Sequence, residues 1–289
     1  MKRTIVICTA LLLVAVIPMG HSKEDIPFLW LDATNNPGDA QNKWDNIGTS
    51  GGDIGPGADL GGANPSLVNK EVMNGKLKAY YEGDAEGEFF GDDAGDGPPF
   101  HVEDYTFEMW LIHNGPASGG GEHQISGFYD FPEPARTQWL CYRFVPPDTG
   151  AINTYICGGK TDNANRFSFA TGVDIGKNTW RQVVFQYDDN ANTHTSFMDG
   201  RQVNKQDVEK KQDFDHDINV SVATVFAIAF IEPNNRTMNG GIAILRVWDK
   251  LLEPDTIKDL FDDPYGQQVF SVDPADKIST TWGAVKRGF

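Results

Sequence analysis

The sequence is poor in basic residues. Its 289 residues include 24 Lys and Arg against 41 Asp and Glu, which gives a formal net charge of −17 at pH 7. An acidic surface repels phosphate backbones and anionic lipid headgroups. We therefore expect no nucleic-acid partner and no attraction to an anionic membrane surface.

Long apolar runs are also missing, apart from one near the N-terminus. Lys2 and Arg3 precede an apolar run over 4–19, and Gly20 and Ser22 stand at positions −3 and −1 of a cleavage site. The run is shorter than the roughly 20 residues that a membrane-spanning helix needs. The pattern indicates a cleaved signal peptide over residues 1–22, with a membrane anchor as the alternative. We expect a secreted protein that is extracellular, periplasmic or attached to the cell surface, with no membrane insertion after cleavage.

Cysteine is scarce, with three residues in the chain, and Cys8 lies in the predicted signal peptide. Cys141 and Cys157 flank a Pro-Pro-Asp-Thr-Gly turn. A hairpin centred on Thr149 would place these two cysteines directly opposite each other, where a cross-strand disulfide is possible. Secretion favours this disulfide, which would stabilise the fold by about 3 kcal/mol. Two buried thiols are the alternative.

Helical periodicity is rare. One stretch, 254–263, has Pro254 at a first helical position and apolar Ile257, Leu260 and Phe261 at helical spacing. Most of the remaining chain alternates in the manner of strands separated by Gly-rich turns. The sequence predicts an all-β, two-sheet antiparallel jelly-roll sandwich over 23–264 with one short C-terminal helix, and a tail of unknown role over 265–289. The predicted strands are 26–32, 105–112, 122–131, 137–145, 152–157, 166–171, 179–188, 193–200, 218–231 and 241–249.

Two of these strands have apolar side chains at alternate positions, so that one face of each can enter a core between the sheets. The first strand places Phe107, Met109 and Leu111 on such a face. The second has Val183, Phe185 and Tyr187.

Three segments in a fixed order resemble laminin-G-like jelly rolls. They are DYTFEMWL (104–111), NTWRQVVFQYDD with the following SFMDGRQV (178–203), and MNGGIAILRVWDKLLEPDTIKDLF (238–261). By this resemblance the chain is identified as a member of the concanavalin A-like lectin/glucanase superfamily. The resemblance implies the sandwich fold and a module that binds a glycan or an extracellular protein.

The large apolar ring of tryptophan can stack against a sugar ring, and the chain has seven tryptophans. By resemblance Trp110, Trp180 and Trp248 occupy core positions, and Trp30 belongs to the first strand. The candidate ligand-binding residues are Trp44 and Trp139, with Trp282 in the tail. A loop pattern shared with the family also explains Trp44, and Trp139 can pack beside Cys141 on the same strand face.

The stretch YYEGDAEGEFFG (80–91) carries carboxylates at alternate positions, which share one face of a strand: Glu82, Asp84, Glu86 and Glu88. It matches the Glu-x-Asp-x-Glu pattern of the superfamily's glucanases, which would make Glu82 a nucleophile and Glu86 an acid/base. Such a pair must bring its carboxyl groups to roughly 5–5.5 Å. The residues between them are too small to fix this geometry from the core. We therefore expect no enzyme, with a glycoside hydrolase or lyase as the alternative.

Some laminin-G-like domains hold one calcium ion at the rim of the sandwich, and calcium prefers six to eight hard oxygen ligands. By this resemblance the cofactor to test is one Ca²⁺. Solvated loop carboxylates are the alternative interpretation. The candidate metal ligands are Asp84, Asp92, Asp93, Asp188 and Asp189.

The sequence therefore favours a secreted binding or adhesion module that recognises a glycan or a protein through loops at the rim, assisted by calcium if the metal site exists. A structural component of an extracellular assembly is the other non-catalytic alternative. The oligomeric state and the identity of the ligand are not fixed by the sequence.

Overall fold

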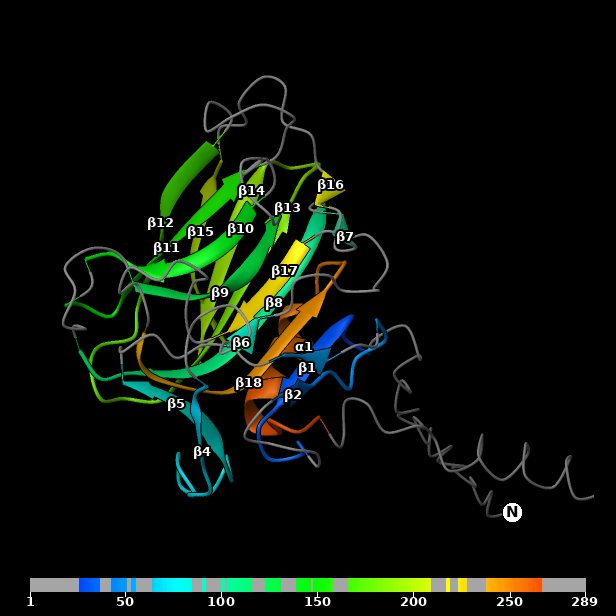
Figure 1. Ribbon diagram of the computed structural model, residues 1–289. Coiled ribbons are helices and arrows are strands. Elements are labelled where there is room, and N and C mark those ends of the chain that lie inside the picture. Colours follow the sequence, from blue (N-terminus) through cyan, green and yellow to red (C-terminus); the bar gives the residue numbers. More distant parts are fainter. Residues whose placement is uncertain are drawn as a thin grey trace, which may run out of the picture. The chain divides into compact units, whose positions relative to one another are not determined.

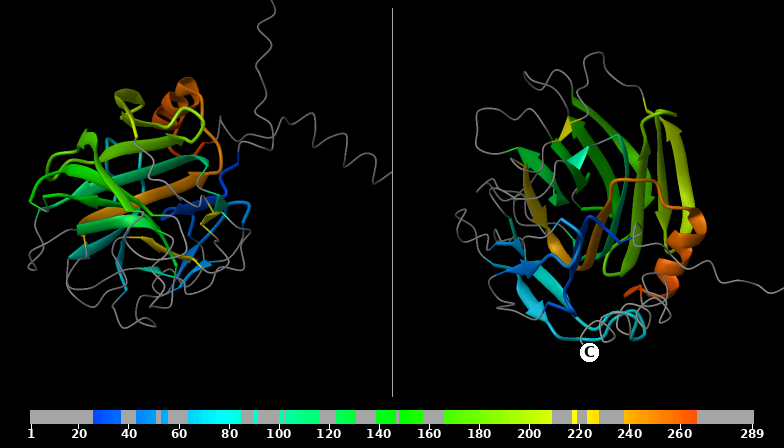
Figure 2. Two further views of the ribbon diagram at one scale, coloured as in Figure 1. Left: turned by 90° about the horizontal axis from the view of Figure 1, so that it is seen from above. Right: turned by 90° about the vertical axis from the view of Figure 1, so that its right-hand side faces the viewer.

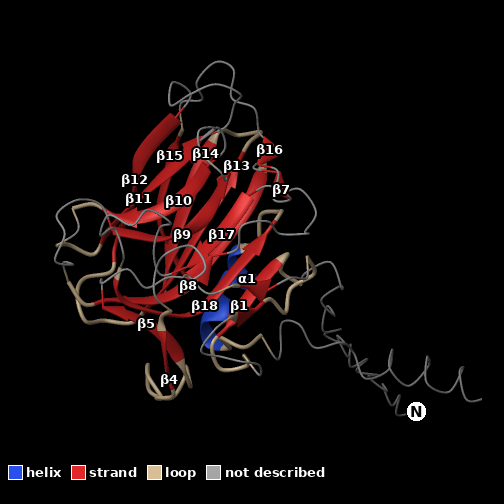
Figure 3. Ribbon diagram, in the orientation of Figure 1, coloured by secondary structure: helices blue, strands red, loops and turns tan. Residues whose placement is uncertain are grey.

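Antiparallel strands dominate the structure, which is a computed structural model (Figures 1 and 3). One sheet has the order β15(Arg201–Asp207)-β14(Thr193–Met198)-β13(Arg181–Asp188)-β8(Asp104–His113)-β18(Asn239–Trp248)-β5(Tyr80–Asp84)-β4(Ser66–Val68), and β1(Leu29–Asp32) also pairs with β18. The second has the order β12(Arg166–Asp174)-β11(Ala151–Cys157)-β10(Trp139–Phe144)-β9(His123–Asp130)-β17(Ala223–Ala227)-β6(Phe90–Gly91). We call them the eight-stranded and six-stranded sheets. The predicted all-β sandwich is confirmed.

The structure describes residues 26–36, 43–50, 53–55, 64–84, 90–91, 100–101, 103–115, 123–130, 139–146, 148–157, 166–208, 217–218, 223–227 and 238–266. They lie in one compact unit that runs from Ile26 to Val269. The predicted signal peptide is outside the described residues. Within them, no helix is long and apolar enough to cross a membrane.

Three short elements complete the described fold. The strand pairs β2(Trp44–Asp45) with β3(Asp53–Ile54) and β7(Phe100–His101) with β16(Asp217–Ile218) form two-stranded sheets. The helix α1(Pro254–Asp262) begins with proline near its first position, as predicted, because proline needs no hydrogen-bonded N–H there.

The core lies between the two sheets (Figure 2). The predicted core faces of β8 and β13 are buried as expected, with Phe107 and Phe185 at its centre. Phe107 meets Tyr142 of the six-stranded sheet with ring centroids 5.0 Å apart, and Tyr142 stacks on Phe185 at 4.2 Å. Aromatic pairs with this geometry contribute about 0.5–1.5 kcal/mol each beyond the burial of their area.

The predicted tail begins too early. Tyr265 is part of the sandwich, since its hydroxyl accepts a hydrogen bond from the backbone N–H of Lys78 at 2.8 Å and pairs with the Thr34 hydroxyl at 3.0 Å. These bonds tie the segment after α1 to segments near the N-terminus of the compact unit.

Candidate functional site

The outer face of the eight-stranded sheet is covered by other parts of the protein. A second apolar cluster lies there, with Trp110 and Tyr80 among its buried members. Phe261 of α1 stacks on Trp110 at a centroid distance of 5.7 Å, and Trp180 meets Tyr80 edge-on at 4.9 Å. Since the helix and these rings fill this face, it offers little room for a ligand.

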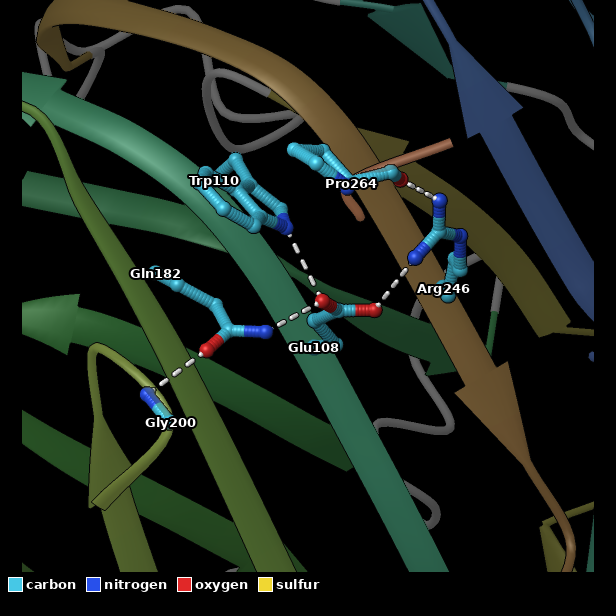
Figure 4. Close-up of polar contacts among 6 residues, drawn as sticks. All are labelled: Glu108, Trp110, Gln182, Gly200, Arg246 and Pro264. Carbon is cyan, nitrogen blue, oxygen red and sulfur yellow. Dashed lines mark hydrogen bonds and ion pairs between the residues drawn. The ribbon is translucent and has the colours of Figure 1, made fainter. Parts of the chain in front are cut away.

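A buried ion pair lies beneath this cover (Figure 4). Glu108 and Arg246 are each 0% exposed, and Arg246 Nη1 donates to Glu108 Oε2 at 2.9 Å. Trp110 Nε1 and Gln182 Nε2 both donate to Glu108 Oε1, at 2.9 and 2.8 Å. Arg246 Nη2 donates to the carbonyl of Pro264, just after α1. Both carboxylate oxygens have donors, so the cluster joins three strands and the end of the helix and serves as structural support.

The outer face of the six-stranded sheet carries a different polar group. Arg143 on β10 lies directly opposite Gln124 on β9 and Asn153 on β11, so the three share a face. Their neighbours Tyr142 and Ile125 enter the core. We call Gln124, Arg143 and Asn153 the polar row.

A β-bulge sets the direction of Gln124. The register between β9 and β10 shifts between Tyr142 and Arg143, so that Ser126 faces Tyr142 while Gln124 faces Arg143. Ile125 is the extra residue on β9. A bulge of this kind re-aims the side chains beside it, and here it lets Ile125 enter the core while Gln124 joins the polar row.

Gln124 is the unusual member of the row. Its side chain is 0% exposed. Within the described structure, neither its amide nitrogen nor its carbonyl oxygen has a hydrogen-bond partner. A buried polar group left without a partner costs roughly 1–3 kcal/mol, so each such group calls for an explanation, and a bound water or ion is one of them. Arg143, opposite, is 4% exposed, and its Nη2 donates to the Ser168 hydroxyl of β12 at 3.3 Å.

The prediction that Trp44 stacks on a sugar is wrong for this structure. Trp44 is 0% exposed and belongs to the core, where its ring lies 4.7 Å from that of Tyr81. The β2–β3 hairpin begins at Trp44, and the sequence did not show that this hairpin folds onto the sandwich. Trp139 is the first residue of β10, opposite Tyr129 and Cys157, and its sugar-stacking role stays a prediction.

The predicted disulfide is also wrong. Cys141 is a buried thiol opposite Tyr155, whereas Cys157 lies opposite Trp139. The hairpin is therefore centred on Asp148 rather than Thr149, which offsets the cysteines by two residues. Diagonal neighbours of this kind are about 7–8 Å apart, beyond the usual Cα separation of a disulfide.

The structure describes the side chains of two predicted metal ligands, Asp188 and Asp189. Asp188 Oδ1 accepts a hydrogen bond from the Ala191 N–H at 2.7 Å, and Asp189 Oδ1 accepts one from the Tyr187 hydroxyl at 3.4 Å. No group of three potential ligands that could hold a metal occurs among the described residues. Asp84 ends β5, and Asp92 and Asp93 lie outside the described residues.

Glu82 lies on β5 as the strand prediction expected, opposite Gly241 and Ser66. Because its neighbour Tyr81 points into the core, Glu82 shares the outer face of the eight-stranded sheet with Tyr80. That is the face on which α1 packs, and the polar row is on the other sheet. Glu86 lies outside the described residues.

Sequence reasoning missed Gln124 and Arg143. Both lie in strands that the alternating pattern predicted, and alternation alone assigns Arg143 to the outer face. The missing information was the bulge that turns Gln124 outward and the burial of both side chains, neither of which has a local sequence signal.

Comparisons with known proteins agree with this architecture. A family model described as the concanavalin A-like lectin/glucanases superfamily matches residues 92–258. No curated protein matches the chain. The binding domain of botulinum neurotoxin serotype G is similar, with a TM-score of 0.54 at 11% identity, over 81% of this chain and 50% of that one.

The serotype D binding domain has a TM-score of 0.52 at 13% identity, over 83% and 52% of the two chains. A botulinum neurotoxin type C structure has a TM-score of 0.51 at 12% identity, over 83% and 51%. This chain therefore spans about half the length of these structures. At these identities the likeness concerns the fold.

Proposed function

The chain belongs to the concanavalin A-like lectin/glucanases superfamily, and from this premise we propose that it is a non-catalytic module that binds a glycan on the outer face of its six-stranded sheet. The observation that carries the proposal is the buried Gln124 amide, whose donor and acceptor both lack a partner among the described residues. Sugar hydroxyl groups donate and accept hydrogen bonds, so a glycan can satisfy both amide atoms at once.

Two further observations support the proposal, the first for the choice of face and the second for a binding role. The eight-stranded sheet is covered by α1 and the apolar cluster around Trp110. The fold also serves as a binding domain in other proteins, and cell entry of botulinum neurotoxin type C depends on interaction with two ganglioside molecules.

A glycan array probed with the full chain tests the proposal. We expect binding to a limited set of glycans, and loss of that binding in Gln124→Met, which keeps the length of the side chain and removes its hydrogen bonds. Val203→Thr is the control, because Val203 is exposed on the edge strand β15. Absence of binding to any glycan would favour the structural-component alternative.

Calcium and secretion remain part of the proposal. If one Ca²⁺ at the rim assists binding, EDTA will weaken the signal on the same array and added calcium will restore it. If the signal peptide is cleaved, mass spectrometry of the exported protein will give an N-terminus at Lys23.

The alternative of a glycosidase has its own test. Hydrolysis of a polysaccharide by the purified chain, lost in both Glu82→Gln and Glu86→Gln, would establish it. The position of Glu82 on the helix-covered sheet disfavours this outcome, because a polysaccharide would need an open groove there.

A further inference from the structure

The two sheets meet along one side of the sandwich, where β12 lies beside β14 and β15 (Figure 1). Three side chains of β14 and β15 donate hydrogen bonds to backbone carbonyl groups of β12. Ser196 Oγ and Asn204 Nδ2 donate to the Thr171 carbonyl at 2.8 and 3.0 Å. Gln206 Nε2 donates to the Ala170 carbonyl at 2.8 Å. We call this contact between β12 and the pair β14–β15 the seam.

Strand β12 is held less firmly at the seam than the central strands are. Among the described strands it pairs with β11 alone, as the edge of the six-stranded sheet. Ile152 of β11 faces Val173, whereas the next residue of β11 faces Ala170. Two residues of β12 therefore lie between these pairs, and a bulge of this kind interrupts the ladder of backbone hydrogen bonds. Since local opening involves the segments with the least packing and pairing, β12 is the strand of the seam that moves at the lowest cost.

His194 of β14 lies behind the seam. Its side chain is 0% exposed, and its ring meets that of Phe169 of β12 with centroids 4.9 Å apart. Two further rings, of Tyr142 and Phe185, lie at 6.5 and 5.7 Å. Nδ1 lies 3.4 Å from the Ser196 hydroxyl, while Nε2 has no hydrogen-bond partner within the described structure. A protonated imidazole donates from both nitrogens, so the closed seam does not satisfy it.

No charged group among the described residues faces this ring to offset a bound proton. The titratable side chains that face it are Tyr142 from β10 and Tyr187, its partner on β13. Burial raises the pKa of both hydroxyls, so they are neutral throughout the acid range. Phe169 from β12 and Gln206 from β15 are uncharged. Burial also lowers the pKa of His194 to about 3, so this imidazole takes up a proton far more readily when the seam is open.

We propose that His194 makes the seam an acid-sensitive joint, in which protonation of the imidazole separates β12 from β14 and β15 while the central strands of both sheets stay paired. Movement of β12 takes the Phe169 ring away from His194 and lets water reach the imidazole. Strands β8 and β13 are paired on both sides, so their opening costs more. The opened form exposes aromatic surface of the core that the closed form hides, and this inference does not depend on the identity of the glycan.

The size of the effect follows from the two pKa values of His194. In the open form the imidazole is protonated below about pH 6.5, and in the closed form below about pH 3. Between these two values, the ratio of open to closed forms should rise about tenfold for each unit by which the pH falls. From pH 7.5 to pH 4.5 the total rise is roughly 100-fold.

Hydrogen exchange of the full chain, followed by mass spectrometry at pH 7.5 and at pH 4.5, measures this opening. Correction for the intrinsic pH dependence of amide exchange gives the protection of β12 and of β8. We expect the protection of β12 to fall roughly 100-fold in the parent, with β8 better protected than β12 at both pH values. In His194→Phe, which cannot take up the proton, the protection of β12 should be the same at both.

Gln206→Leu is the matched control, because it removes one hydrogen bond of the seam and keeps His194. It should lower the protection of β12 by the same factor at both pH values and leave the roughly 100-fold dependence on pH unchanged. If His194→Phe does not fold, His194→Gln takes its place, since an amide side chain does not titrate in this range either.

A loss of β12 protection in acid that is present in the parent and in Gln206→Leu, and absent from the His194 variant, supports the proposal. Three results would overturn it. Equal protection of β12 and β8 in the parent would show that β12 opens only when the whole domain unfolds. A loss that persists in the His194 variant would assign the titration to another group. Unchanged protection of β12 in the parent would show that the seam stays closed in acid.

Discussion

The Glu108–Arg246 pair is a single interaction on which several elements depend (Figure 4). Both side chains are fully buried. The guanidinium also packs over the Trp30 ring at 4.8 Å. Loss of one partner from a buried pair leaves a charge that water cannot reach, at a cost of about 3–5 kcal/mol. We predict a loss of this size in the free energy of unfolding of Arg246→Met, measured by urea denaturation.

The double variant Glu108→Gln/Arg246→Met is its control. It removes both charges and keeps an amide oxygen as the acceptor for Trp110 and Gln182. We expect it to recover a large part of the lost stability. If Arg246→Met is destabilised by less than about 1 kcal/mol, the Glu108–Arg246 pair contributes no more than a solvent-exposed ion pair does.

His194 should make the free energy of unfolding depend on pH. It is completely buried among the rings of Tyr142, Phe169 and Phe185, and burial lowers the pKa of its imidazole from 6.5 to about 3. Between pH 6.5 and about 3, the imidazole of His194 is protonated in the unfolded chain and stays neutral in the folded chain. Stability should therefore fall as the pH drops from about 6.5 to about 3, by about 1.4 kcal/mol per pH unit from this residue.

His194→Phe should remove this contribution, because a phenyl ring cannot take up the proton. The Ser196 hydroxyl keeps its hydrogen bond to the Thr171 carbonyl at 2.8 Å in this variant. Chemical denaturation at pH 7 and at pH 4.5 measures the difference. If parent and variant lose the same stability between these two conditions, His194 is not the group that titrates.

At the scale of elements, side chains of β14 and β15 close one side of the sandwich. Ser196, Asn204 and Gln206 donate hydrogen bonds to carbonyl groups of β12 at 2.8–3.0 Å, which join an edge of one sheet to the other. Gly172 of β12 makes room for Asn204. It has φ +76°, and a Cβ there would lie 2.8 Å from the Asn204 Cβ.

We predict that Gly172→Ala destabilises the protein by about 2–3 kcal/mol. About 1–2 kcal/mol comes from the left-handed backbone conformation, and about 1 kcal/mol from displacement of Asn204 and its hydrogen bond. Gly176→Ala is the matched control. Gly176 has φ +68°, and a methyl group added there would meet nothing within 4 Å, so this variant should show the backbone part alone. Equal shifts in the thermal midpoint of the two variants would contradict the contact with Asn204.

Strands and helix could be predicted from the sequence because each has a local signal. The apolar alternation of β8 and β13 and the proline at the start of α1 sufficed for elements that the structure confirms. The register in which strands pair has no such local signal in the sequence. The two-residue offset between Cys141 and Cys157, the bulge at Gln124 and the burial of Trp44 all depend on how distant segments meet. The candidate site depends on the bulge and on the burial of Gln124 and Arg143, which is why its residues were missed.

At the scale of the whole molecule, the matched family segment, residues 92–258, is smaller than the folding unit. Strand β18 pairs along one edge with β8, and along the other with β5 at 239–242 and with β1 at 244–247. Both β1 and β5 precede residue 92. The segment also ends inside α1, before the buried Leu260 and before Phe261, which stacks on Trp110.

We therefore predict that a fragment of residues 92–258 does not fold cooperatively, whereas residues 26–269 unfold with the midpoint of the full chain. Without β1 and β5, one edge of β18 is unpaired and its buried Ile242 and Leu245 lose the covering of Tyr81 and Leu31. An exposed, apolar, unpaired edge favours aggregation over folding. Near-ultraviolet circular dichroism during heating provides the measurement. A sharp transition in the short fragment would show that β8 and the six-stranded sheet hold β18 without its N-terminal neighbours.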